Sequence, residues 1–155
     1  MSIDYDSRVA TYEHKTEVCA AISRIIADLL QRTVEHDASK LVSPEVEVFD
    51  RVTPQLRGLT YGSDEYKVAL ADMGEGLLHH YAANRHHPEH FSEGIRGMTI
   101  VDMVEMFCDW MAATKRHADG DLMKSIRLNQ KRFGYSDDLK DIFENTAKAM
   151  QEVTL

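Results

Sequence analysis

Histidines crowd one short stretch of this chain. Five of its eight histidines lie within twelve residues, at His79, His80, His86, His87 and His90. If the stretch is helical, histidines seven residues apart share a face, whereas adjacent ones point in different directions. Neutral imidazole is the commonest protein ligand for transition metals. The spacing therefore predicts a metal site that takes one histidine of each adjacent pair. A solvated helix end with incidental histidines is the alternative.

A second pair of candidate ligands is His36 and Asp37, which are adjacent in the chain. At a helix end, both side chains can converge on one divalent cation, and mixed nitrogen and oxygen donors suit Mn, Fe, Co, Ni or Zn. The alternative is that Asp37 or Ser39 caps a helical turn. His14 lies on or beside the apolar face of the preceding helical segment, where a lone histidine is more often a core or boundary residue.

The carboxylate of Asp109 lies in the apolar run Phe107–Met111. Burying an unpaired carboxylate is costly, so Asp109 needs a cation or strong hydrogen-bond donors. We therefore expect Asp109 to be a metal ligand. Asp102 shares the same helical stripe as Glu105 and Asp109, but capping of the helix that begins at Thr99 explains it.

Helical periodicity dominates the segments that must position these residues. Apolar residues recur at steps of three and four, helix caps separate the periodic runs, and no convincing strand is present. The predicted helices cover residues 8–33, 44–56, 63–84, 99–116, a segment after the turn Asp119–Asp121 that ends near Phe133, and 137–152. The residues from 85 to 98 read as a loop. These patterns predict an all-α fold, a single compact domain of about six helices over residues 1–155.

The composition excludes several classes of function. The 155 residues include 26 acidic and 18 basic side chains, for a net charge of −8, which disfavours a duplex nucleic-acid binder. No apolar run is long enough for a membrane span, and no signal peptide is visible. Two distant cysteines, Cys19 and Cys108, read as reduced and buried thiols, so we expect a cytoplasmic protein. The sequence leaves open whether the protein forms a homodimer.

In this order, these residues resemble the pattern of the HD superfamily of metal-dependent phosphohydrolases. His14 matches the first histidine of that pattern, His36 and Asp37 match the HD pair, and Asp109 matches the late aspartate. Lys40 follows the pair as in the HD-x-x-K variant. The chain is also similar to a small HD-like family of phages and bacteria that combines HD-x-SK-x-x-PE, H-x-x-x-N-x-HH and a D-W helix. An HD-domain-like helical bundle is the fold that this resemblance implies.

The resemblance also implies a site with one or two divalent metals, Mn, Fe, Co, Ni or Zn, with Mg as a further choice. The first ion would take four ligands: His14, His36, Asp37 and Asp109. The second would take two of His80, His86 and His87, with Asp37 bridging. Lys40 would contact a phosphate that Asn84 and Arg85 orient, and His87 or His90 would protonate the leaving group.

The implied function is hydrolysis of a phosphoester, such as a nucleotide, by a metal-activated water, with Asp37, Lys40 and His87 as catalytic residues. Two other classes stay open. One is a catalytically silent HD-like module that binds a nucleotide or a protein. The other is a di-iron HD-type oxygenase, for which Tyr81 and Glu75 lie near the histidines in the sequence.

Overall fold

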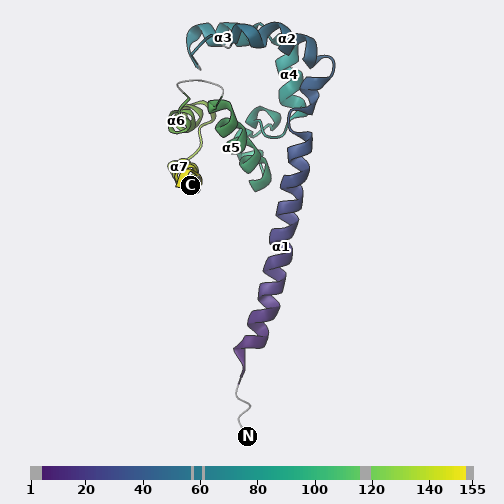
Figure 1. Cartoon of the computed structure of the whole chain (residues 1–155), viewed down its shortest axis with the longest axis vertical. Coiled ribbons are helices and arrows are strands. Elements are labelled where there is room, and N and C mark those ends of the chain that lie inside the picture. Colours follow the sequence, from purple (N-terminus) through teal and green to yellow (C-terminus); the bar gives the residue numbers. More distant parts are fainter. Residues whose placement is uncertain (1–4, 57, 61, 116–119, 153–155) are drawn as a thin grey trace. The chain divides into compact units, whose positions relative to one another are not determined.

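The computed structural model describes residues 5–56, 58–60, 62–115 and 120–152, with side chains up to residue 150. Within these ranges the chain forms seven α-helices and three short 3-10 helices and contains no strand (Figure 1). The α-helices are α1 (Ser7–Glu35), α2 (Glu45–Leu56), α3 (Asp64–Ala71), α4 (Gly74–Ala83), α5 (Ile100–Thr114), α6 (Leu122–Phe133) and α7 (Asp137–Glu152). The 3-10 helices are η1 (Ala38–Leu41), η2 (Pro88–His90) and η3 (Gly94–Gly97). The all-α prediction is confirmed.

The structure has seven α-helices in the described residues where about six were predicted, because one predicted helix is divided into two. The segment 63–84 breaks into α3 and α4 at Asp72 and Met73. Gly74 has a φ of +47°, in the left-handed region, which a continuous right-handed helix does not allow. Apolar periodicity continues through this break, so the spacing alone does not reveal it.

Local capping sets several of the other helix ends. Thr99 and Asp102 form both halves of the predicted capping box at the start of α5. Gly134 ends α6 with a φ of +67°, and the Ser136 hydroxyl accepts a hydrogen bond from the Leu139 amide at 3.3 Å. Residues 116 and 119, at the predicted end of the fourth helix and in the turn Asp119–Asp121, lie outside the described residues.

Two compact units divide the chain, one over residues 1–36 and one over residues 37–155. The first is α1, a single uninterrupted helix of 29 residues that is about 43 Å long at 1.5 Å per residue. The second holds all the other helices. The predicted single domain spans residues 1–155 and so includes both units; it stays a prediction.

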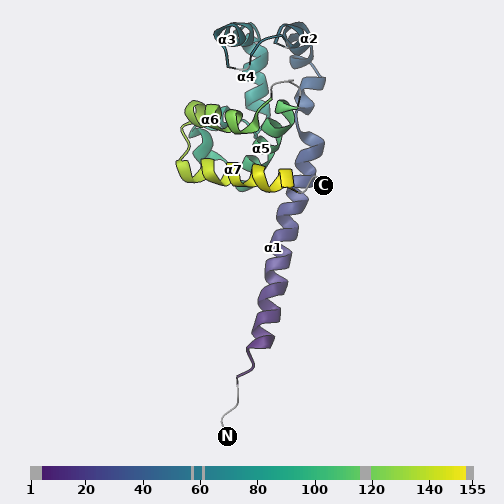
Figure 2. The same cartoon turned by 60° about the vertical axis from the view of Figure 1, so that its left-hand side comes forward.

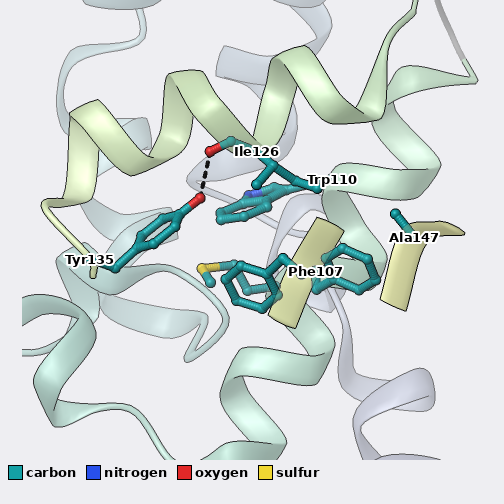
Figure 3. Packing of buried hydrophobic residues seen from close by; sticks show 7 residues of the cluster. Phe107, Trp110, Ile126, Tyr135 and Ala147 are labelled. Atoms are coloured by element: carbon teal, nitrogen blue, oxygen red, sulfur yellow. Dashed lines mark hydrogen bonds between the residues drawn. The ribbon is translucent and has the colours of Figure 1, made fainter. Parts of the chain in front are cut away.

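The hydrophobic core of the second unit lies among α5, α6 and α7 (Figure 3). Phe107 and Phe143 stack with their ring centroids 5.4 Å apart, and Trp110 packs edge-to-face on Phe143 at 5.6 Å. The Tyr135 hydroxyl is buried beneath α6 and donates a hydrogen bond to the Ile126 carbonyl. The hydrogen bond compensates the buried hydroxyl for its lost contacts with water, so Tyr135 contributes to the core without an unpaired polar atom.

In the rest of the second unit, α2 contacts η1, α3 and α4, and η2 contacts α4 and η3. Figures 1 and 2 show α2 and α4 side by side in both views. Gly76 of α4 makes this approach possible, because a Cβ there would lie only 2.8 Å from Cγ2 of Val48. The close contact brings the first turn of α2 to the histidine-rich end of α4.

The structure also bears on the predictions for the two cysteines and for membrane-spanning segments. Cys19 and Cys108 are exposed, so the predicted burial of both thiols is wrong. Cys108 lies on α5 beside the core residues Met106 and Phe107, but outside the buried face of that helix. None of the described helices is long and apolar enough to cross a membrane.

We expect Phe143→Ala to lower the free energy of unfolding by about 3 to 5 kcal/mol, because it removes a buried ring that three aromatic residues contact. Ile142→Ala on the same helix is the matched control, since Ile142 is exposed, and its effect should stay within about 0.5 kcal/mol. Urea titration followed by circular dichroism measures both. Equal losses for the two variants would contradict this description of the core.

Candidate metal centre

Four potential metal ligands converge in the second unit: Asp37, His80, His86 and His87. One donor atom of each lies within 4.8 Å of a donor atom of every other. Asp37 precedes η1, His80 lies in the last turn of α4, and His86 and His87 lie in the short segment between α4 and η2. The structure thus gathers residues that are up to 50 positions apart in the sequence into a cluster that could hold a metal ion.

The separations within this cluster suit a small coordination shell. Oδ1 of Asp37 lies 3.5 Å from Nε2 of His80 and 3.6 Å from Nε2 of His86. Neighbouring ligands of a tetrahedral ion with bonds of about 2.1 Å are about 3.4 Å apart. Nε2 of His80 and Nε2 of His87 are closer, at 2.8 Å, and share a hydrogen bond. To bind one ion in place of that proton, the two nitrogens would have to separate by about 0.6 Å.

The backbone and a lysine orient Asp37. Its φ of 57° places it in the left-handed region, which aspartate tolerates better than most residues and which recurs at functional sites. Oδ2 of Asp37 accepts a hydrogen bond from Nζ of Lys40 at 2.6 Å, and Lys40 lies over the Phe49 ring, 4.9 Å from its centroid. One carboxylate oxygen therefore faces the lysine while the other faces the histidines.

A buried glutamate supports His80 from behind. Glu45, the first residue of α2, is 0% exposed. Its Oε2 lies 2.9 Å from Nδ1 of His80 and accepts a hydrogen bond from the Ser39 hydroxyl at 2.9 Å. Its Oε1 lies 2.7 Å from Nδ1 of His79. Burial raises the pKa of Glu45, but the hydrogen bonds from His79, Ser39 and His80 outweigh it, so the net pKa lies below the ordinary value.

A second glutamate lies close to Nδ1 of His86. Oε1 of Glu105, on α5, lies 3.1 Å from Nδ1 of His86. His86 itself is 2% exposed. Metal-bound histidines commonly direct their remote nitrogen to a carboxylate, which orients the ring and increases its basicity. Both buried histidines of the cluster have a carboxylate oxygen close to Nδ1, at 2.9 Å for His80, where it forms a hydrogen bond, and at 3.1 Å for His86.

The electrostatics of the cluster favour neutral imidazoles. Burial lowers the pKa of His80, and Lys40 adds to the effect. Burial also lowers the pKa of His87 far below its ordinary value, together with the neighbouring charges of His86, His80, Lys40 and Arg132. Both rings are therefore neutral near pH 7, the form that binds a metal. A His87 held neutral is a poor general acid, so its surroundings favour a ligand role over the predicted catalytic one.

A cavity of about 580 Å³ adjoins the cluster. His80, His86, His87 and Lys40 line one part of it. Elsewhere its wall is formed by aromatic and aliphatic side chains with a few charged ones. The charged residues away from the cluster are Asp109, Asp121, Lys124 and Arg132. Arg132 is held by Glu89 at 2.6 Å and by the Tyr81 hydroxyl at 3.1 Å.

The first unit contains two predicted ligands, His14 and His36. His14 lies within α1, and His36 is the residue that ends it. They are 22 residues apart on one continuous helix, which is about 33 Å at 1.5 Å per residue. They cannot bind the same ion within one chain. The shared first site that the resemblance implies is thus incompatible with an uninterrupted α1.

Three further predicted site residues lie near the cluster without joining it. Asp109 lines the cavity but is not one of the four clustered ligands. Asn84 is buried and donates hydrogen bonds to the Ser39 hydroxyl at 2.7 Å and to the His80 carbonyl at 2.8 Å. Arg85 forms two hydrogen bonds of 3.0 Å with Asp102. The hydrogen bonds of Asn84 and Arg85 favour structural roles for both over the predicted contact with substrate.

Sequence reasoning missed the two glutamates. Glu45 reads as an ordinary acidic residue in the first turn of a helix, and Glu105 reads as part of a solvated stripe. The available signal for Glu105 was its helical spacing from Asp109, which places both on one side of α5. For Glu45 no local pattern distinguishes a buried carboxylate from an exposed one.

We expect zinc to raise the melting temperature of the protein, because a ligand that binds the folded state stabilises it by about 2.7 kcal/mol at about 100 times its Kd. His86→Gln should abolish most of the shift, since it removes a buried ligand. His90→Gln, four residues further on and outside the cluster, should retain it. Calorimetric titration with zinc, cobalt, nickel and manganese measures the affinities. A wild-type protein that binds none of them would contradict the assignment.

Comparison with known proteins gives one finding. The sequence profile of a family of unknown function (DUF5662) matches residues 3–153. No curated protein and no solved structure matches the chain. Because the match extends over nearly the full length, the chain belongs to the family of unknown function DUF5662.

Proposed function

We propose that this protein is a divalent-metal-dependent phosphohydrolase that acts on a phosphoester with a sizeable organic group, such as a nucleotide. The observation that carries the proposal is the convergence of Asp37, His80, His86 and His87 beside a cavity that Lys40 also lines. Three nitrogen donors and one carboxylate suit a transition metal such as Zn, Mn, Fe, Co or Ni. A bound ion would supply a Lewis acid and lower the pKa of a water molecule.

The charge of the cavity supports an anionic substrate. The whole chain carries a net charge of −8, yet the lining includes the three cations Lys40, Lys124 and Arg132 and only two carboxylates, Asp109 and Asp121. A concave surface of one sign concentrates ligands of the opposite sign. Lys40 contacts one of the clustered ligands, Asp37, through its Oδ2. A phosphoryl oxygen that approaches the cluster would therefore meet Nζ of Lys40.

The size and walls of the cavity support an organic group on that phosphate. A volume of about 580 Å³ lies within the usual range of about 300 to 1,000 Å³ for sites that bind small organic molecules. Tyr66, Tyr81, Trp110 and Phe133 contribute aromatic surface to the wall. These rings can pack against a planar or apolar group and exclude water around the phosphoester. Inorganic phosphate alone would leave most of this volume unfilled.

Phosphate release from metal-loaded protein tests the proposal. The protein is stripped with a chelator, reloaded with Mn, Co, Ni, Zn, Mg or ferrous iron, and assayed on aryl phosphates, nucleotides and cyclic nucleotides. We expect metal-dependent hydrolysis that Asp37→Asn lowers by at least about 100-fold, because a ligand is weakened. Asp50→Asn, an exposed aspartate on α2, should leave the rate unchanged. Retained metal without turnover would instead indicate a binding module, and an absorbing iron centre an oxygenase.

Lys40→Met separates substrate binding from metal binding. The lysine would donate a charge-assisted hydrogen bond to the phosphate, so its loss should raise KM about 10- to 100-fold. Zinc affinity should change much less, since all four clustered ligands remain. Lys67→Met serves as the control, because Lys67 is exposed on α3 and pairs only locally with Asp64. An unchanged KM in Lys40→Met would remove this residue from the substrate site.

A further inference from the structure

Nδ1 of His80 has two neighbours, and their hydrogen bonds determine which nitrogen of the ring carries the proton. One neighbour is Oε2 of Glu45 at 2.9 Å, and the other is Nδ2 of Asn84 at 3.0 Å. The amide protons of Asn84 are directed to the Ser39 hydroxyl and to the His80 carbonyl, at 2.7 and 2.8 Å. A carboxylate only accepts hydrogen bonds. The proton between His80 and Glu45 therefore belongs to Nδ1 of His80.

The hydrogen bonds on Glu45 form a consistent chain. Asn84 donates to the Ser39 hydroxyl, which in turn donates to Oε2 of Glu45. His79 occupies the other oxygen, at 2.7 Å. With both oxygens engaged and no exposure to solvent, the carboxylate cannot rotate without leaving donors or acceptors unpaired. The adjacent histidines thus have different tasks: His79 restrains Glu45, and Glu45 restrains His80.

With the proton on Nδ1, a neutral His80 presents a bare Nε2. That nitrogen lies 3.5 Å from Oδ1 of Asp37 and 2.8 Å from Nε2 of His87, which places its lone pair toward the clustered ligands. The opposite tautomer would direct an N–H bond into the cluster and block a metal ligand.

We propose that Glu45 is a positioning residue that sets the tautomer and ring orientation of His80, so that Nε2 rather than Nδ1 faces the metal centre. Its effect on metal affinity rests on the proposed metal site, whereas its effect on the tautomer does not. Carboxylates in this position typically change metal affinity by about 10- to 100-fold when they are removed. Glu105 lies 3.1 Å from Nδ1 of the second buried histidine, His86.

NMR of the histidine ring nitrogens in the metal-free, full-length protein tests the tautomer directly, with the His80 signals assigned from a His80→Gln spectrum. We expect His80 to carry its proton on Nδ1 in the wild type and to lose this preference in Glu45→Gln. Glu47→Gln is the matched control, since Glu47 is exposed on the same helix. A wild-type His80 protonated on Nε2 would overturn the proposal, and this readout needs no variant of Glu45 that folds.

Zinc titration supplies the second readout. Glu45→Gln should bind zinc about 10- to 100-fold more weakly than Glu47→Gln, and Ser39→Ala, which removes only one donor to Glu45, should show a smaller loss. Equal affinities for Glu45→Gln and Glu47→Gln would overturn the proposal. If neither the wild type nor any variant binds a metal, the proposed function fails. The NMR result still decides the role of Glu45 in that case.

Discussion

The burial of the Glu45 carboxylate is the constraint on which the candidate site depends. A carboxylate without solvent must receive hydrogen bonds, and those of Glu45 come from η1 through Ser39 and from α4 through His79 and His80. One charged group thereby joins three segments of the chain. Removing a partner from such a buried charge costs about 3 to 5 kcal/mol, so η1, α2 and α4 keep one arrangement. Asp37, at the start of η1, is placed beside His80 as a result.

The helix α5 connects this polar network with the hydrophobic core. Met106, Phe107 and Trp110 on one part of its surface are buried among α6 and α7. Glu105 and Asp109 lie on another part, toward His86 and the cavity. A site built on a helix with a well-packed face keeps its side chains in place when a ligand enters.

Charge is distributed unevenly between the chain and its cavity. The excess of acidic residues in the sequence disfavours long polyanions, which contact a wide surface. Within the cavity, however, Lys40, Lys124 and Arg132 form part of the wall. These cations support the proposed small anionic substrate better than they support a long polyanion.

Local sequence patterns were sufficient to predict most of the helices. The caps at Thr99 and Ser136 and the stop at Gly134 rest on contacts within four residues, so they are visible in the sequence. The break between α3 and α4 was not visible, because it depends on the conformation of Gly74 rather than on periodicity. The histidine-rich segment and Asp37 were recognisable as potential ligands by residue type alone. The long first helix was also recognisable, but its consequence for His14 and His36 follows only from its continuity.

The sequence by itself thus determined the all-α class, the helix caps and the residue types available to a metal. Tertiary structure decided which member of the pair His79 and His80 faces the cluster, because it is His80 that lies beside Asp37, 43 residues earlier in the sequence. It also directed Arg85 to Asp102, 17 residues away. Helical periodicity reports only on neighbours within a turn or two. Contacts between segments depend on how the helices pack, and a single close approach, such as that of Gly76 to Val48, is enough to set them.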